Sequence, residues 1–160
     1  MVDITVALAS RREAVMSVQK CPDCGADGNR CQQHFHMMGF WELDHQLWDK
    51  HHLMVLSYNL QHPHIYSPQT LESAKQMLVD FLENDVSPQQ MRRKISTQVD
   101  SGTRKHKITG TPDSHGTYEH PVQWSMTCAD VVAAGIENYY DSVDQWAASV
   151  LQDLRDSGNL

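Results

Sequence analysis

The sequence predicts an all-α fold, a single-domain irregular helical bundle with a cysteine-containing loop near the N-terminus and a long irregular loop at about 100–126. Apolar residues recur at intervals of three and four in several segments, as they do on one face of a helix. The pairs Ser67-Pro68 and Ser87-Pro88 are typical helix starts, because serine caps a helix and proline suits its first position. The 160 residues are the size of one domain, long enough to bury a core without disulfides.

The chain is expected to begin with an N-terminal extension, residues 1–20, followed by the main helical domain at 21–157. A helix is predicted over 4–19, and the alternative is a short strand at 4–8 followed by a turn. Residues 21–30 are predicted to form a loop, because this stretch holds one proline and two glycines.

Two helices, 31–43 and 46–61, are predicted to follow the loop and to form an antiparallel pair joined by a tight turn. The second is the most apolar segment of the chain, so we expect it at the centre of the core. It must end near Gln61, because Pro63 disfavours helical geometry at the residue before it. Glu42 lies near the turn between the two helices, where carboxylates are usually solvated.

Four further segments complete the predicted bundle. The two Ser-Pro pairs begin helices whose apolar residues keep helical spacing: Leu71, Ala74, Met77, Leu78, Phe81 and Leu82 in the first, and Met91, Ile95 and Val99 in the second. Residues 100–126 have no clear period and form a long loop, with room for a short hairpin at 106–119. Thr127 and Asp130 resemble a capping box that begins a short helix at 128–134. The last helix carries Val143, Trp146, Ala147, Val150, Leu151 and Leu154 on one face.

Charge and hydropathy argue against two classes of partner. The net charge of −7 disfavours a general binder of nucleic acid or of anionic membranes, which needs an excess of basic residues. A local exception is a basic cluster, which leaves open a phosphate or carboxylate site: Arg92, Arg93, Lys94, Arg104, Lys105 and Lys107. No apolar run has the length of a membrane span and the N-terminus lacks the features of a signal peptide, so we expect a cytoplasmic protein.

Three of the four cysteines, Cys21, Cys24 and Cys31, lie within the eleven residues CPDCGADGNRC. Two cysteines three apart, with Pro and Gly shaping the turn, can place both sulfurs on one metal ion. In the cytoplasm thiols stay reduced, so such a cluster indicates metal ligands before disulfides. The loop therefore resembles a zinc knuckle with a third thiolate after it. Cys128 stands alone at a predicted helix start and is expected to be a small buried thiol.

The fourth ligand is predicted to be His62. In an antiparallel pair, the start of the first helix lies beside the end of the second, which brings Cys31 and His62 to the same end as the knuckle. His34, one turn after Cys31, is a fallback ligand. Three histidines of the long loop also stay open as candidates, since that loop could fold back over the site: His106, His115 and His120.

His51 and Tyr58 form a second group of interest. His51 lies eleven residues before His62, about 16 Å along a straight helix, so both cannot bind one ion. Both His51 and Tyr58 are expected on the side of the helix that faces the bundle interior. They are either hydrogen-bonded core residues or candidate catalytic groups of a second functional site.

These segments together resemble an uncharacterised family of short bacterial proteins, a domain of unknown function. The resemblance rests on the CPDCG knuckle, the later Cys31 and the HHLMVLSYNLQHP segment from His51 to Pro63, and it covers roughly 21–155. A tail with the pattern V-x-x-W-A-x-x-V belongs to it, matched by Val143, Trp146, Ala147 and Val150. It implies no reaction, and it implies these family positions: Cys21, Cys24, Cys31, His51, Tyr58, Gln61 and His62.

Three functions are compatible with the sequence. The first is a zinc-binding helical protein whose metal is mainly structural and which binds a partner protein or a small ligand, because three thiolates and one histidine close the coordination sphere of Zn²⁺. The second is a small metal-dependent hydrolase or transferase, DinB-like in outline, that uses His51 and Tyr58. The third is a regulatory or nucleic-acid-associated module that uses the basic cluster, although the net acidity disfavours nucleic-acid binding.

Overall fold

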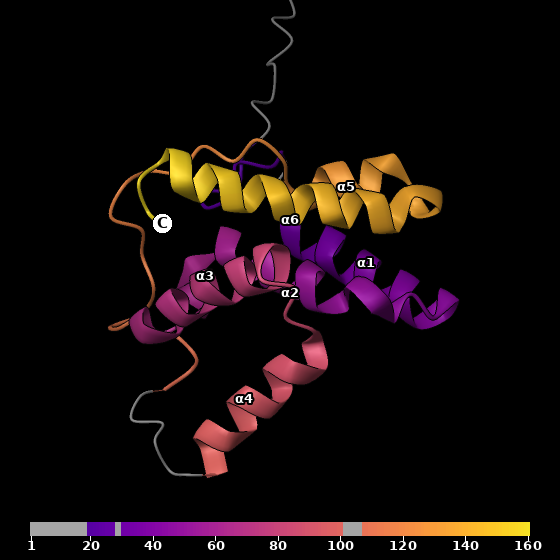
Figure 1. Cartoon of the computed structure of the whole chain (residues 1–160). Helices are drawn as coiled ribbons and strands as arrows, with labels where there is room; N and C mark the ends of the chain where they lie inside the picture. Colours follow the sequence, from indigo (N-terminus) through magenta and orange to yellow (C-terminus); the bar gives the residue numbers. More distant parts are fainter. Residues whose placement is uncertain (1–18, 28–29, 101–106) are drawn as a thin grey trace, which may run out of the picture.

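The computed structural model of the chain describes residues 19–27, 30–100 and 107–160, and in this part it confirms the all-α prediction (Figure 1). The predicted helix at 4–19 lies, except for Gln19, outside the described residues, and so does most of the extension 1–20. The helices are α1 (Cys31–His45), α2 (His51–Gln61), α3 (Pro68–Glu83), α4 (Pro88–Asp100), α5 (Cys128–Ala134) and α6 (Tyr139–Asp156), with 3-10 turns η1 (Trp48–Lys50), η2 (Pro63–Ile65) and η3 (Ile136–Asn138). None of the helices in this part of the chain has the length and apolar character needed to cross a membrane.

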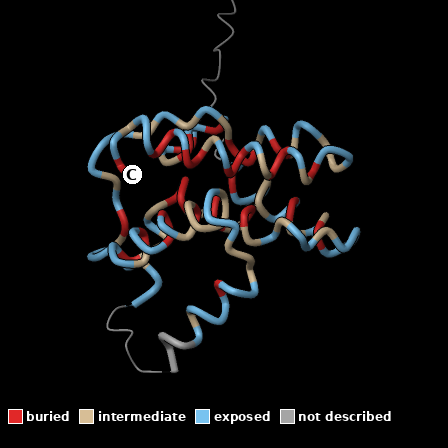
Figure 2. The backbone as a smooth tube through the Cα atoms, in the orientation of Figure 1, coloured by how far each residue is buried: buried red, intermediate tan, exposed pale blue. Residues whose placement is uncertain are grey.

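The helices pack in two layers around a single core, and α4 stands apart (Figure 1). Helix α6 packs against α2, α3 and α5, while α1 packs against α5. Buried residues gather on the surfaces between the layers, whereas α4 is exposed over most of the length whose side chains are described (Figure 2). The largest fully buried side chain is Trp146 of α6. The predicted apolar face of this last helix is confirmed, since its six residues are buried: Val143, Trp146, Ala147, Val150, Leu151 and Leu154.

The predicted helix at 46–61 is wrong in its first turn. Helix α1 continues to His45 and ends at Gln46, which adopts the left-handed conformation with φ 56°. The 3-10 turn η1 follows, and α2 begins only at His51. His51 is therefore the first residue of a helix and lies beside the turn, instead of in the middle of a longer helix.

The end of α2 agrees with the prediction from Pro63. The helix ends at Gln61. His62 has a non-helical backbone with φ −128° and ψ 66°, and Pro63 begins η2. Gln61 is fully buried, where its amide donates to the carbonyl of Met126 at 2.7 Å and its carbonyl accepts from the Trp146 indole at 3.2 Å. The end of α2 is thus bonded both to the segment before α5 and to α6.

The predicted helix starts are present. Ser67 caps α3, since its hydroxyl accepts from the Thr70 N–H at 3.2 Å. At the start of α4, the Ser87 N–H donates to the side chain of Gln90 at 2.7 Å, and the Gln90 N–H donates back to the Ser87 hydroxyl. The short helix α5 occupies the predicted range, and the Asp130 carboxylate accepts from the Thr127 N–H at 2.7 Å.

The long loop is irregular, as predicted, and its described part runs along η2. Thr109 forms an isolated β-bridge with Tyr66, which lies outside the loop. Within the described residues 107–119, the backbone of Thr111 pairs with that of Ser114 across a tight turn, and the possible hairpin is limited to this turn. The N–H groups of Gly110 and Gly116 donate to the carbonyls of Ile65 and Tyr66 at 2.9 and 2.7 Å. The loop therefore covers the end of α2, next to the cysteine-containing loop.

Candidate metal centre

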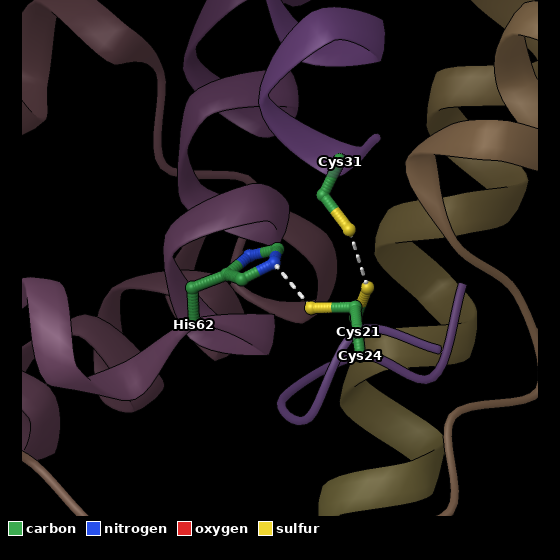
Figure 3. Close-up of side chains that lie close together, drawn as sticks. All are labelled: Cys21, Cys24, Cys31 and His62. Carbon is green, nitrogen blue, oxygen red and sulfur yellow. Dashed lines mark hydrogen bonds between the residues drawn. The ribbon is translucent and has the colours of Figure 1, made fainter. Parts of the chain in front are cut away.

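The CPDCG loop is closed on itself by its own backbone. The Cys21 N–H donates to the carbonyl of Ala26 at 2.9 Å, and the Gly25 N–H donates to the carbonyl of Cys21 at 3.0 Å. Gly25 has φ +74°, a conformation that side-chain-bearing residues rarely adopt. The tight turn places the thiols of Cys21 and Cys24 on the same side of the loop, facing the helices (Figure 3).

Four side chains meet at this point: Cys21, Cys24, Cys31 and His62 (Figure 3). Their ligand atoms all lie within 4.8 Å of one another, and the residues are only 3 to 6% exposed. His62 Nε2 lies 3.7 Å from the sulfur of Cys21, and the sulfurs of Cys24 and Cys31 are 3.1 Å apart. All four cysteines of the chain are free thiols. A buried Cys3His group with these spacings could hold a metal ion.

Helices α1 and α2 run antiparallel, since Glu42 contacts His51 at one end of the pair and Cys31 meets His62 at the other. Cys31 is the first residue of α1 and His62 directly follows α2, so both lie at the same end of the helix pair. The segment before α5 adds a contact from the other side, since the Trp124 indole donates to the carbonyl of Asp23 at 3.1 Å. Asp23 also pairs with Nδ1 of His64 at 3.2 Å, on the segment after His62.

His62 is oriented by the helix that precedes it. Its Nδ1 lies 2.7 Å from the carbonyl oxygen of Tyr58. A carbonyl only accepts, so Nδ1 carries the proton and Nε2, which faces Cys21, has a free lone pair. Burial lowers the pKa of His62 and keeps the imidazole neutral. This is the tautomer and charge state that a metal-binding histidine needs.

The thiols of the group are chemically unequal without a cation. Burial raises the pKa of Cys31 to about 12 and also raises the pKa of Cys24, since buried thiolates are poorly solvated. Burial acts in the same direction on Cys21, but hydrogen bonds from the backbone of Cys24 and Asp23 and from the neighbouring thiols together outweigh it and hold the pKa of Cys21 below its usual value. A divalent cation bound by the three sulfurs would supply the missing opposite charge.

Cys128 lies beside the group without belonging to it. It is fully buried at the start of α5, and its thiol donates to the carbonyl of Cys31 at 3.7 Å. Burial raises its pKa to about 12, so the thiol stays protonated even though it stands at a helix start.

Of the candidate histidine ligands, His62 alone belongs to the Cys3His group among the described residues. His34 lies one turn after Cys31 and is not part of the Cys3His group; its buried Nδ1 has no hydrogen-bond partner among the described residues. His115 has its Nδ1 3.1 Å from the carbonyl of Gly116, and the backbone of His120 is bonded to Asn159. His106 lies outside the described residues.

His51 and Tyr58 lie two turns apart on α2 and contact different partners. The ring of Tyr58 is buried between those of Phe35 and His62, with centroid distances of 4.2 Å to each. His51 contacts Glu42 instead, with 2.6 Å between Nδ1 and the carboxylate, and its side chain is 49% exposed. Tyr58 is thus a neighbour of the Cys3His group, whereas His51 belongs to the turn between α1 and α2.

Glu42 and Tyr139 are the residues that the sequence interpretation missed. Glu42 was expected in solvent, but it is 0% exposed, and its carboxylate also accepts from the Tyr139 hydroxyl at 2.7 Å. The spacing of Cys31, Met38 and Glu42 on the buried side of α1 is a helical signal that could have placed Glu42 in the interior. Tyr139 carried no such signal, because it is 97 residues away along the chain.

A pocket of about 940 Å³ opens beside the Cys3His group. Its wall combines the CPDCG loop with the segment before α5 and includes Cys21, Cys24, His34 and Trp124. Charged residues of both signs also line it: Lys20, Asp23, Asp27, Arg30 and Asp130. A small ligand in this pocket would lie directly against the loop that carries two of the thiols.

The basic cluster is divided between described and undescribed parts of the chain. Arg92, Arg93 and Lys94 are exposed on α4, where the Lys94 ammonium pairs with Asp80 at 3.5 Å. Arg104 and Lys105 lie outside the described residues. The role of this cluster in binding an anion stays a prediction.

The model of a family of unknown function (DUF5946) matches residues 19–155, which is most of the chain. The match includes all four residues of the Cys3His group, the pocket and the six helices as far as residue 155 of α6. No curated protein and no solved structure matches the chain.

Proposed function

This chain belongs to the family of unknown function DUF5946, and we propose that it is a zinc-binding helical protein whose metal mainly stabilises the fold. The observation that carries the proposal is the convergence of three buried thiols and one neutral imidazole within 4.8 Å. Burial raises the pKa of Cys24 and of Cys31, because buried thiolates are poorly solvated, and a bound cation would compensate their negative charge.

The donor set favours zinc over other divalent ions. Thiolates are soft ligands, and Zn²⁺ accepts three sulfurs and one nitrogen in a tetrahedron with bonds of about 2.0–2.3 Å. Such a tetrahedron has edges of roughly 3.5–3.8 Å. The distance of 3.7 Å between Cys21 and His62 already fits, and the 3.1 Å between Cys24 and Cys31 requires only a small outward movement.

A structural role follows from the number of ligands. Four protein ligands leave no open coordination position for water or substrate, which is the pattern of structural zinc sites. The ion would connect three segments, the CPDCG loop, the start of α1 at Cys31 and the end of α2 at His62. It would thereby hold in place the loop that forms one wall of the adjacent pocket.

The proposed zinc site serves a domain that binds a small ligand or a partner protein. The pocket of about 940 Å³ supports this part, since it has the size of small-molecule sites and holds groups of both charges next to Trp124. Four free thiols are compatible with a cytoplasmic protein, which is the location we propose.

Metal analysis of matched cysteine variants tests the zinc proposal. We expect about one zinc per chain in the purified protein. Cys24→Ser should lose the metal and part of the helical circular dichroism signal, whereas Cys128→Ser, which changes an equally buried thiol, should retain the metal. A metal-free protein that is fully helical would overturn the proposal.

Cobalt substitution separates the structural site from a metal-dependent enzyme. A closed site should give the strong visible bands of tetrahedral cobalt with thiolate charge-transfer bands, unchanged by added anions such as azide. Azide-dependent changes would show an open position and favour the enzyme.

A further inference from the structure

Glu42 is a carboxylate in the interior of the protein, at the opposite end of α2 from the Cys3His group. It is 0% exposed, and its two oxygens accept separate hydrogen bonds, one from His51 Nδ1 at 2.6 Å and one from the Tyr139 hydroxyl at 2.7 Å. A buried carboxylate is costly unless hydrogen bonds and positive charge compensate it. The two donors therefore stabilise the Glu42 carboxylate in the interior.

Two helix starts converge on this carboxylate. His51 is the first residue of α2 and Tyr139 is the first residue of α6. The N-terminus of a helix carries a partial positive charge, which stabilises a nearby anion. Burial, together with the bond to Glu42, raises the pKa of Tyr139, so its hydroxyl stays a donor at neutral pH.

The imidazole of His51 is not hidden with its partners. Its Nδ1 is turned to the buried carboxylate, its side chain is 49% exposed, and its Nε2 makes no hydrogen bond with the described residues. The Trp48 ring lies edge-on to it, with 5.7 Å between centroids, and Trp48 is itself 49% exposed. The imidazole and the indole therefore form a half-exposed pair next to the buried carboxylate.

A metal is not the natural ligand of His51. Within the described residues, the Cys3His cluster is the one group of side chains spaced to hold a metal ion, and His51 is outside it. A phosphate ester is disfavoured as well, because Asp49 and Asp144 carry negative charge nearby and the Lys50 ammonium already pairs with Asp144 at 2.8 Å. An imidazole with Nδ1 bound to a carboxylate and Nε2 free is suited to proton transfer.

We propose that Glu42, His51 and Tyr139 form a metal-independent acid–base site that hydrolyses uncharged esters, with Trp48 contacting an apolar or aromatic part of the substrate. His51 Nε2 takes a proton from a water molecule as the water oxygen bonds to the ester carbonyl carbon. Nε2 then returns the proton to the leaving alcohol oxygen as the carbon–oxygen bond breaks. The products are a carboxylic acid and an alcohol, with no change in oxidation state.

The three residues have different roles in this reaction. His51 is the catalytic residue, because it alone contacts the reacting water and leaving group. Glu42 and Tyr139 are positioning residues, since Glu42 fixes the ring and stabilises the imidazolium through Nδ1, and Tyr139 holds Glu42. The proposal does not depend on the zinc ion.

Hydrolysis of p-nitrophenyl acetate by the full zinc-loaded chain tests the proposal. His51→Ala should lower kcat/KM at least about tenfold, because general acid–base catalysis typically contributes more than that. The matched control is His45→Ala, which removes an exposed histidine of α1 that pairs with exposed Asp44 and should leave the rate unchanged. Zinc content, measured in both variants, should not change, which separates this test from that of the metal centre.

Separate measurements of kcat and KM distinguish a positioning role of Glu42 and Tyr139 from a purely structural one. Glu42→Gln and Tyr139→Phe should lower kcat with little change in KM, whereas Trp48→Ala should raise KM. The wild-type rate should be slower in D2O, as expected for proton transfer by a general base. Equal losses in His51→Ala and His45→Ala, or an acyl-histidine accumulating in mass spectra, would overturn the proposal. If Glu42→Gln does not fold, His51→Ala still decides, because it removes a half-exposed side chain.

Discussion

His62 Nδ1 donates to the carbonyl of Tyr58 at 2.7 Å, which directs Nε2 of the same ring toward the sulfur of Cys21. The helix that carries His62 thus also selects its tautomer. We expect His62→Ala to lose the metal, because among the described residues His62 supplies the single nitrogen ligand of the Cys3His group. His64→Ala is the matched control, since His64 is an exposed neighbour that pairs with Asp23. Retention of metal in both variants would show that His62 is not a ligand.

Zinc binding should release protons and weaken as the pH falls. Burial raises the pKa of Cys31 to about 12 and raises that of Cys24, so both thiols are protonated at neutral pH in the metal-free fold. The pKa of Cys21 is lowered, so this thiol gives up its proton more readily, and the lowered pKa of His62 favours the neutral imidazole, which binds zinc through Nε2 without losing a proton. About two to three protons should therefore leave for each zinc bound.

A calorimetric titration in buffers of different ionisation enthalpy measures this proton release. Because protons and zinc compete for the same sulfurs, the affinity for zinc should decrease as the pH is lowered. An affinity that does not change with pH would contradict thiolate ligation.

The packing of the long loop on η2 should depend on two glycines. A Cβ at Gly110 would lie 2.2 Å from the carbonyl oxygen of His64, and one at Gly116 would lie 2.6 Å from that of Pro63. Backbone atoms cannot easily move away, so Gly110→Ala and Gly116→Ala should each destabilise the fold by about 1–3 kcal/mol. Thermal or urea unfolding measures the change. Gly39→Ala is the control, because nothing lies within 4 Å and alanine suits the α1 helix, so its stability should stay equal or rise.

Gln61 should contribute to stability through its two buried bonds. Gln61→Ala leaves the Met126 carbonyl and the Trp146 indole without their partner, and an unsatisfied buried polar group costs about 1–3 kcal/mol. Urea unfolding should show this loss. Gln76→Ala removes an exposed amide that bonds Asp80 on the same helix and should change the stability by less than about 0.5 kcal/mol.

Much of the fold could be predicted because its signals are local. Ser67, Ser87 and Thr127 begin helices through contacts with residues three positions later, and Pro63 ends α2 by its own ring geometry. The proximity of Cys31 and His62 followed from one tight turn between two helices.

The features that the sequence did not predict depend on contacts between residues far apart in the chain or on an unusual backbone conformation. The break between α1 and α2 rests on the left-handed conformation of Gln46, where no glycine or proline marks it. The burial of Glu42 depends on Tyr139, which reaches it only after the chain has folded. The packing of Trp124 on the knuckle likewise joins residues 101 positions apart.

X-ray absorption at the zinc edge of the purified protein tests most directly whether three cysteines and one histidine bind the zinc ion. We predict one first shell with three sulfurs at about 2.3 Å and one nitrogen at about 2.0–2.1 Å, with the outer-shell scattering of a single imidazole. Loss of the imidazole scattering in His62→Ala would assign that nitrogen. A shell with an oxygen ligand, or with four sulfurs because Cys128 replaces His62, would contradict a closed site built from Cys21, Cys24, Cys31 and His62.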